Sequence, residues 1–129
     1  MNKILIIDDE RPIRSTLKEI LEFEKFQVDD AEDGKAGYEM IQKNKYELIL
    51  CDIKMPKMDG MEVLEKSISS GVDTPFIMIS GHGNVETAVE AIKKGAYDFI
   101  QKPLDLNRIL VTLRNALDKE TIVKENVTL

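Results

Sequence analysis

Short apolar runs alternate with longer amphipathic stretches along the chain. The short runs predict five β-strands, around residues 4–7, 26–31, 48–51, 75–80 and 97–101. Three of these runs, ILII, LILC and FIMI, are apolar at successive rather than alternate positions. Both faces of such strands must be covered, as in the centre of a parallel sheet flanked by helices. The other two strands are weaker and are expected nearer the sheet edges.

The stretches between the strands have the 3.6-residue period of amphipathic helices. We expect a first helix just after Glu10, a second over about residues 34–44, and a third from near Gly60 that ends before residue 71. A fourth helix follows Asn84 as N-cap and ends at residues 93–95, and a fifth opens at Asp105. In the third and fourth helices the apolar residues that share helical spacing are Met61, Leu64, Ile68, Val85, Ala88, Val89 and Ile92.

Five strand–helix units with right-handed crossovers predict a specific α/β architecture. It is a flavodoxin-like (βα)5 three-layer sandwich, whose parallel sheet has the strand order 2-1-3-4-5. The chain contains no internal repeat or linker before residue 118, so residues 1–118 are expected to form one domain. Residues 119–129 are polar with scattered apolar positions, and we expect them to extend the fifth helix or to link it to an output domain absent from this sequence.

Charge and size narrow the classes of partner. The chain has 129 residues and a net charge of -6, so it should repel nucleic acid phosphates and anionic membranes. The apolar run at residues 4–7 is far shorter than the roughly 20 residues of a membrane helix, and Cys51 has no second cysteine to pair with. We therefore expect a cytoplasmic protein that binds proteins, cations or small molecules and does not contact nucleic acid or membrane.

Acidic residues follow two strands that the expected order makes neighbours. The first strand ends in Asp8, Asp9 and Glu10, and the third ends in Asp52. In a parallel sheet the carboxyl ends of these strands share one edge, where ligands bind at the switch in strand order. Several like charges in one crevice require protonation or a cation. An open acidic crevice with oxygen ligands suits Mg2+.

The other two strands bring complementary groups to the same edge. Ser80 ends the fourth strand, and Lys102 with Pro103 follows the fifth. A cation and an ammonium group neutralise phosphoryl oxygens, a hydroxyl hydrogen-bonds one of them, and a carboxylate can act as the nucleophile. Each residue alone has a simpler explanation, such as an N-cap role for Asp9. Four strands delivering compatible groups to one edge favour a phosphoryl site.

The sequence leaves three rival functions to compare. A nucleotide or flavin binder would need a glycine-rich turn after the first strand, where this chain has acidic residues. A hydrolase with an aspartyl-phosphate intermediate normally has a second acid two residues past the nucleophile, where Lys54 stands. A protein-interaction module with a vestigial pocket does not need the whole set of residues. His82, in a glycine-flanked loop without a second histidine, is expected to be a mobile loop residue rather than a metal ligand.

The residues at the strand ends resemble those of the receiver domain of bacterial response regulators. The matching features are the Asp8-Asp9 pair, Asp52 within LILCDIKMPKMDG, Ser80 after FIMI, and Lys102-Pro103 closing YDFIQKP. Residues 83–117 are most similar to receivers of the nitrogen-regulatory type, which precede an AAA+ ATPase and a DNA-binding domain. The resemblance covers the chain to about residue 118.

The resemblance implies a role for each matching residue. Asp52 is the expected phosphoacceptor, and the expected Mg2+ ligands are Asp9 and Asp52 directly, Asp8 through water, and the backbone carbonyl of Lys54. Lys102 is expected to pair with the phosphoryl group, and its bond to Pro103 to be cis. Ser80 and Phe99 are the expected switch residues.

The resemblance also implies partners and an output. A sensor histidine kinase or a phosphotransfer protein would donate the phosphoryl group, and the domain would assist its own phosphorylation and dephosphorylation without being an enzyme. The fourth helix, fifth strand and fifth helix would form the responding surface, which can also support a homodimer. Control of transcription through a separate output domain is the favoured function, and a stand-alone receiver acting as a protein-interaction switch is the alternative.

Overall fold

A computed structural model of the chain describes residues 2–81 and 84–128. His82 lies outside these residues, so its expected role is not addressed by the structure. The strands are β1 (Lys3–Ile7), β2 (Gln27–Ala31), β3 (Leu48–Asp52), β4 (Phe76–Ser80) and β5 (Asp98–Gln101). The helices are α1 (Arg11–Phe23), α2 (Gly34–Lys43), α3 (Gly60–Ser69), α4 (Val85–Lys93) and α5 (Leu106–Thr128). None of the described helices is long and apolar enough to cross a membrane.

The five strands form one parallel sheet in the order β2-β1-β3-β4-β5, as the sequence predicts. The central strands β3 and β4 are buried at every position, whereas β2 and β5 at the edges contain partly exposed residues. This arrangement confirms the expectation that continuous apolar runs lie in the middle of the sheet. Because all strands run in one direction, their carboxyl ends form a single edge of the molecule.

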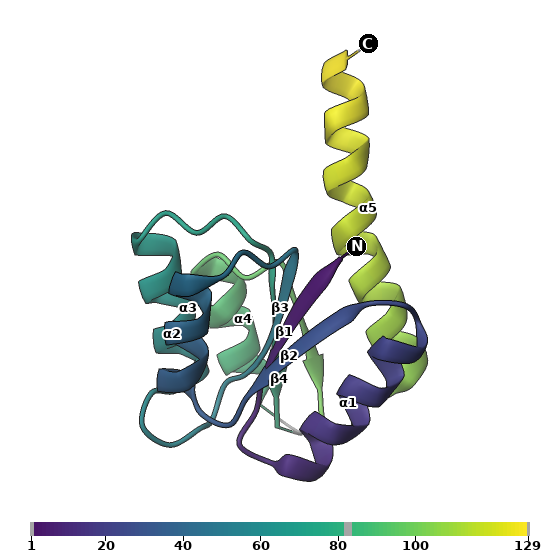
Figure 1. The fold of residues 1–129 in the computed structure, drawn as a ribbon. Coiled ribbons are helices and arrows are strands. Elements are labelled where there is room, and N and C mark those ends of the chain that lie inside the picture. Colours follow the sequence, from purple (N-terminus) through teal and green to yellow (C-terminus); the bar gives the residue numbers. More distant parts are fainter. Residues whose placement is uncertain (1, 82–83, 129) are drawn as a thin grey trace.

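Helices cover both faces of the sheet, which makes the three-layer sandwich (Figure 1). We call the two sides the α1–α5 face and the α2–α4 face. The core of the α1–α5 face includes Ile4, Ile6, Leu17, Leu21, Leu50, Ile77, Ile79, Ile100, Ile109 and Leu113. The core of the α2–α4 face includes Leu5, Ile7, Ile41, Ile49, Cys51, Val63, Leu64, Phe76, Met78 and Ala91. Alternate residues of each strand therefore contribute to opposite cores.

Several of the apolar residues that share helical spacing on α3 and α4 do not face the core. On α4 the residues that face the core are Ala88 and Ala91, while Val85, Val89 and Ile92 are between 38% and 49% exposed. On α3, Ile68 is 41% exposed and Ser67 is buried. Small side chains allow a helix backbone to lie close to the sheet and to neighbouring helices. The face of the helix that carries small residues is therefore the buried one. The larger apolar residues of α4 are left at the surface.

Aspartates start three of the described helices: Asp33 precedes α2, Asp59 precedes α3, and Asp105 precedes α5, where its Oδ1 accepts a hydrogen bond from Asn107 N at 2.8 Å. Asp33 Oδ1 accepts a hydrogen bond from Ala36 N, and Asp59 Oδ1 accepts one from Glu62 N. These bonds satisfy backbone N–H groups that have no partner within the helix. Asn84 occupies the N-cap of α4, but its side chain makes no capping hydrogen bond. The α5 helix begins one residue later than expected, after Asp105, and continues as helix to Thr128.

Candidate functional site

The carboxyl edge of the sheet gathers acidic residues from β1 and β3. Asp8 and Asp9 follow β1, and Asp52 is the last residue of β3. One carboxylate oxygen from each of these three residues lies within 4.8 Å of the others. We call Asp8, Asp9 and Asp52 the acidic triad. Asp8 and Asp52 are buried and Asp9 is exposed, so the triad opens to solvent on one side.

Lys102 brings a positive charge to the triad from the end of β5. Its ammonium lies 3.4 Å from Asp52 Oδ2 and 3.9 Å from Asp8 Oδ2. Its shortest contact is 2.7 Å, to Glu10 Oε2 on the exposed side of the crevice. The sequence predicts that Lys102 and Asp52 meet, and the structure brings them together. The Lys102–Pro103 peptide bond is cis, as the resemblance implied.

The crevice changes the proton affinity of its buried groups. Burial, followed by the neighbouring charge of Asp8, raises the pKa of Asp52 to about 6, and Lys102 opposes this shift. Burial also raises the pKa of Asp8 above its usual value. Burial alone would lower the pKa of Lys102, but its hydrogen bond to Glu10 and the charges of Asp52 and Asp8 raise it. Lys102 therefore remains an ammonium group beside carboxyls that ionise reluctantly.

The triad has the properties of a site for a hard divalent cation. All of its donor atoms are oxygens, which Mg2+ prefers. Asp8 Oδ1 accepts a hydrogen bond from Glu10 N at 2.8 Å, but Asp8 Oδ2 is buried without a hydrogen-bond partner among the described residues. A buried oxygen in this state needs a partner such as an ion or a water, and a bound cation would supply one. The residues present therefore fit the metal that the sequence predicts.

Arg14 supports the crevice and was not anticipated from the sequence. Its Nη1 donates to the backbone carbonyl of Asp8 at 2.7 Å, and its Nε donates to Asp30 Oδ2 at 3.1 Å. Arg14 thereby ties the first turn of α1 to the ends of β1 and β2. An arginine one turn into a helix carries no sequence signal for this role, because its partner is a backbone oxygen.

The loop between β3 and α3 is held tightly against Asp52. Gly60 N donates to the carbonyl of Ile53 at 2.7 Å, and a Cβ atom on Gly60 would collide with the carbonyl oxygen of Asp52. Only glycine permits this close approach. Lys54 is exposed in the loop, two residues after Asp52. The sequence predicts that the third helix starts near Gly60, but it does not reveal this packing role of Gly60.

Ser80 and Phe99 occupy different positions along their strands. Ser80 is the last residue of β4 and is 2% exposed, and its Oγ has no hydrogen-bond partner among the described residues. Phe99 pairs in register with Met78, further from the carboxyl edge, and packs against the core of the α2–α4 face. The structure therefore places Ser80 at the carboxyl edge of the sheet and Phe99 two positions earlier in the register, against the core of the α2–α4 face.

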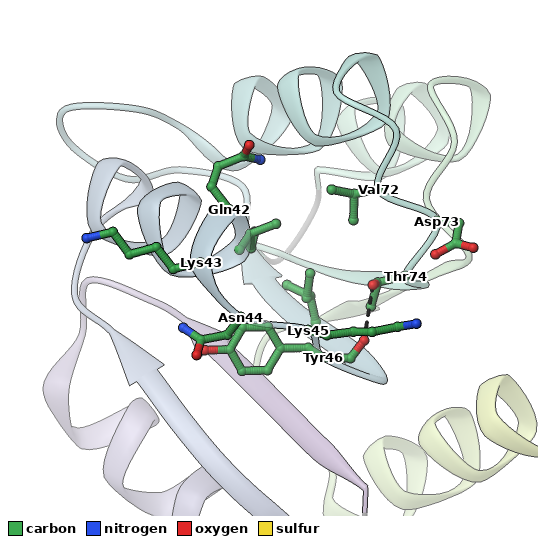
Figure 2. A pocket seen from close by; sticks show the side chains of 10 residues that line it. Gln42, Lys43, Asn44, Lys45, Tyr46, Val72, Asp73 and Thr74 are labelled. Atoms are coloured by element: carbon green, nitrogen blue, oxygen red, sulfur yellow. Dashed lines mark hydrogen bonds between the residues drawn. The ribbon is translucent and has the colours of Figure 1, made fainter.

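A cavity of about 250 Å3 lies at the opposite end of the sheet (Figure 2). Residues that precede β3 and β4 line it, including Tyr46 and Thr74, and Thr74 Oγ1 donates to the carbonyl of Tyr46 at 3.1 Å. The lining contains Asp73 but none of the residues of the triad. The candidate site is therefore the crevice at the carboxyl edge rather than this cavity.

Comparison with known protein families covers both the fold and the candidate site. Residues 4–114 match the model of the response regulator receiver domain family. The chain belongs to this family. The matched range begins at β1 and ends within α5, so the receiver fold and the edge that carries the triad lie inside it.

Individual relatives of this receiver domain are transcriptional and nitrogen-related regulators. The chain is 40% identical to the nitrogen assimilation regulatory protein NtrX of Azorhizobium caulinodans, over 95% of this chain and 27% of that protein. It is 34% identical to the C4-dicarboxylate transport transcriptional regulatory protein DctD of Rhizobium meliloti, over 98% of this chain and 27% of that protein. The crystal structure of NtrX from Brucella abortus superimposes with a TM-score of 0.91 and 35% identity, over 99% of this chain and 29% of that chain. The receiver thus spans about a quarter of the length of these regulators.

Proposed function

We propose that this receiver accepts a phosphoryl group on Asp52 from a phosphohistidine of a sensor histidine kinase or phosphotransfer protein. The observation that carries the proposal is the meeting of the acidic triad with Lys102 at one edge of the sheet. Its oxygens and ammonium match the needs of a transferred phosphoryl group, whose charge must be neutralised while donor and acceptor are aligned.

In the proposed transfer, a carboxylate oxygen of Asp52 forms a bond to phosphorus as the bond from phosphorus to the histidine nitrogen breaks. The electron pair of the broken bond stays on the imidazole of the donor. Lys102 compensates the charge of the phosphoryl oxygens, and Ser80 donates its hydroxyl hydrogen to one of them. The pKa of about 6 leaves Asp52 mainly ionised, and so nucleophilic, at neutral pH.

We assign the Mg2+ ligands as Asp9 and Asp52 directly, Asp8 through water, and the backbone carbonyl of Lys54. When bound, the ion supplies positive charge to the phosphoryl oxygens. Asp8 and Asp9 then serve mainly to hold that charge beside Asp52. The domain assists its own phosphorylation and dephosphorylation, and it converts no separate substrate.

Phosphorylation would shift the equilibrium between two conformations of the surface formed by α4, β5 and α5, with Ser80 and Phe99 as switch residues. Val85, Val89, Ile92, Leu106 and Val111 are exposed apolar side chains on this surface. Such residues suit a protein partner or a homodimer. Since the relatives named above are much longer regulators, we assign residues 119–128 of α5 as a connection towards an output domain that controls transcription. The receiver itself would make no contact with nucleic acid.

The deciding experiment is phosphorylation by a small phosphodonor in the presence of Mg2+, followed by intact-mass spectrometry. We expect wild type to gain one phosphoryl group and Asp52→Asn to gain none. Asp73→Asn is the matched control, because it makes the same change at an exposed position at the other end of the sheet. An unmodified wild-type chain, or equal modification of Asp52→Asn, would remove the proposal.

The alternative is a stand-alone receiver that acts as a protein-interaction switch. Both functions use the same phosphorylation chemistry, so the Asp52 experiment does not separate them. Fusing this receiver to its natural downstream sequence and measuring transcription with and without the phosphodonor does. A response that needs phosphorylation favours the transcriptional function, and an absent downstream domain favours the alternative.

A further inference from the structure

Gln101 lies beside Ser80 at the carboxyl edge of the sheet. The two residues are paired in register between β4 and β5. Neighbouring strand residues in register point to the same face, and the preceding pairs follow this rule. Ile79 and Ile100 both join the core of the α1–α5 face, while Met78 and Phe99 both pack on the α2–α4 face. Ser80 and Gln101 therefore both face α2–α4.

Both side chains carry a buried polar atom that has no partner in the part of the chain that the structure describes. Among the described residues, neither Ser80 Oγ nor Gln101 Nε2 makes a hydrogen bond. The backbones at this point are tied together, since Lys102 N donates to the carbonyl of Ser80 at 2.8 Å. Two unpaired polar atoms on adjacent strands and on one face are an unfavourable arrangement, because buried groups of this kind normally find partners.

The two atoms are chemically complementary. Gln101 Nε2 carries two hydrogens and donates only, whereas a serine hydroxyl donates one hydrogen and accepts through two lone pairs. If the Ser80 hydroxyl turns to donate to a phosphoryl oxygen, its lone pairs remain available to an N–H donor. A single bond from Gln101 Nε2 to Ser80 Oγ would then leave both atoms paired.

We propose that Gln101 is a positioning residue of the switch, whose side-chain amide donates to Ser80 Oγ when Ser80 donates to the phosphoryl group on Asp52. This inference rests on the proposed function. The hydrogen-bond chain polarises the serine hydroxyl and strengthens its bond to the phosphoryl oxygen. It also links the site to β5, because Gln101 stands two residues after Phe99 on the same face of the strand. Phosphorylation thus relieves the two unpaired atoms of the resting state, which favours the switched conformation.

The test uses beryllofluoride with Mg2+ as a phosphoryl mimic on the whole chain. The resonance of the Gln101 side-chain NH2 group in a nitrogen–proton spectrum reports its hydrogen bonding directly. At saturating beryllofluoride we expect this resonance to move downfield in wild type and to stay in place in Ser80→Ala. The side-chain NH2 of Gln27, on the opposite edge strand, serves as the internal reference.

Binding measurements give an independent readout. Gln101→Met keeps the length of the side chain and removes the donor, and we expect it to weaken beryllofluoride binding about threefold to tenfold. Gln27→Met is the matched control, because it makes the same change at an exposed position, and its affinity should equal that of wild type. In the Ser80→Ala background, Gln101→Met should have almost no further effect, since the two residues act as one unit. Urea unfolding of the unliganded proteins checks that each variant folds.

The outcomes separate a failure of the phosphoacceptor function from a failure of the role proposed for Gln101. A wild type that does not bind beryllofluoride overturns the phosphoacceptor function and this inference with it. A wild type that binds, but whose Gln101 side-chain resonance stays in place or moves equally in Ser80→Ala, overturns the inference alone. The same holds if Gln101→Met binds as tightly as wild type, or if its loss of affinity is unchanged without the Ser80 hydroxyl.

Discussion

The ammonium of Lys102 lies 2.7 Å from Glu10 Oε2 and 3.4 Å from Asp52 Oδ2, so the nearer partner is the exposed carboxylate. The Glu10 side chain is 53% exposed and stands at the open side of the crevice. Lys102 is therefore shared between a solvated group and the proposed phosphoacceptor. Any phosphoryl group on Asp52 must compete with Glu10 for this ammonium.

Removing that competition is expected to prolong phosphorylation. Glu10→Gln removes the competing charge while keeping the shape, and exposed ion pairs of this kind contribute up to about 1 kcal/mol. We expect the phosphorylated form to decay about twofold to fivefold more slowly, measured by intact mass after the phosphodonor is withdrawn. Glu39→Gln, at an exposed position of α2, is the control. Faster decay in Glu10→Gln would show that Glu10 supports the site instead.

Removing the ammonium itself is expected to separate modification from response. Lys102→Ala leaves the acidic triad in place, so a small phosphodonor with Mg2+ should still modify Asp52 in part. The conformational response should be lost, because no positive charge at the end of β5 is then available to pair with the phosphoryl group. Intact mass measures the first effect, and the change in the Phe99 resonances on phosphorylation measures the second. Lys45→Ala, at an exposed position before β3, should behave as wild type. A full Phe99 response in Lys102→Ala would contradict the prediction.

The raised pKa of Asp52 predicts how stability depends on pH without divalent cations. The pKa of Asp52 is about 6 in the native state and 3.8 in the ordinary carboxyl. Between these two pH values, the folded protein keeps a proton on Asp52 that the unfolded chain has already released. The stability contributed by this neutral carboxyl is present below the unfolded pKa and is lost as the pH rises through 6. The loss is about 1–3 kcal/mol, where the lower figure allows for screening by solvent at the open side of the crevice.

Asp52→Asn isolates this contribution, because its amide does not titrate. Urea unfolding gives the free energy of unfolding of each protein at pH 4 and pH 7. The difference between Asp52→Asn and wild type should shift in favour of the variant by about 1–3 kcal/mol from pH 4 to pH 7. Asp73→Asn should follow wild type at both values. A constant difference between Asp52→Asn and wild type would indicate that the pKa of Asp52 is not raised in the folded protein.

Mg2+ is expected to stabilise the folded protein at neutral pH. A ligand at one hundred times its dissociation constant adds about 2.7 kcal/mol to the free energy of unfolding. We expect the thermal midpoint of wild type to rise with Mg2+ and that of Asp9→Asn to rise much less. Asp9 is exposed, so its replacement should leave the fold intact. Much tighter binding of Zn2+ than of Mg2+ in the same titration would contradict the assignment of an oxygen-ligand site.

Gly60 should be sensitive to the addition of a single methyl group. Gly60→Ala places a Cβ against the carbonyl of Asp52, so the β3–α3 loop must move. We expect a loss of about 2–4 kcal/mol in urea unfolding, together with slower phosphorylation. Gly71→Ala is the comparison, because its left-handed φ of 89° strains the backbone but no atom lies near the added Cβ. Its loss should be about 1–2 kcal/mol, with phosphorylation unchanged.

The sequence predicts the architecture and the meeting of the site residues for a simple physical reason. Continuous apolar runs identify the central strands, and the carboxyl ends of parallel strands share one edge. That rule alone brings Asp8, Asp9, Asp52 and Lys102 together, without any knowledge of side-chain packing. The edge position of β2 and β5 follows in the same way from their mixed polarity.

Features that depend on close packing could not be predicted in this way. The stripe of α4 that faces the core is set by Ala88 and Ala91 rather than by the larger Val89 and Ile92. Helical period alone does not choose between these stripes. The contact of Arg14 with a backbone carbonyl and the close approach at Gly60 depend on atoms that every residue carries. That Ser80 and Gln101 are neighbours on adjacent strands follows from the register of β4 and β5. The sequence does not specify which residue of one strand lies beside which residue of the next.

The burial of β3 also bears on how long a phosphorylated state lasts. Asp52 is only 4% exposed, and every other residue of its strand is covered on both faces of the sheet. An incoming phosphodonor, and the water that would hydrolyse the proposed acyl phosphate on Asp52, must therefore arrive from the same side of the molecule. A protein bound over this opening would exclude both, so the proposed phosphorylated state would last longer while that protein stays bound.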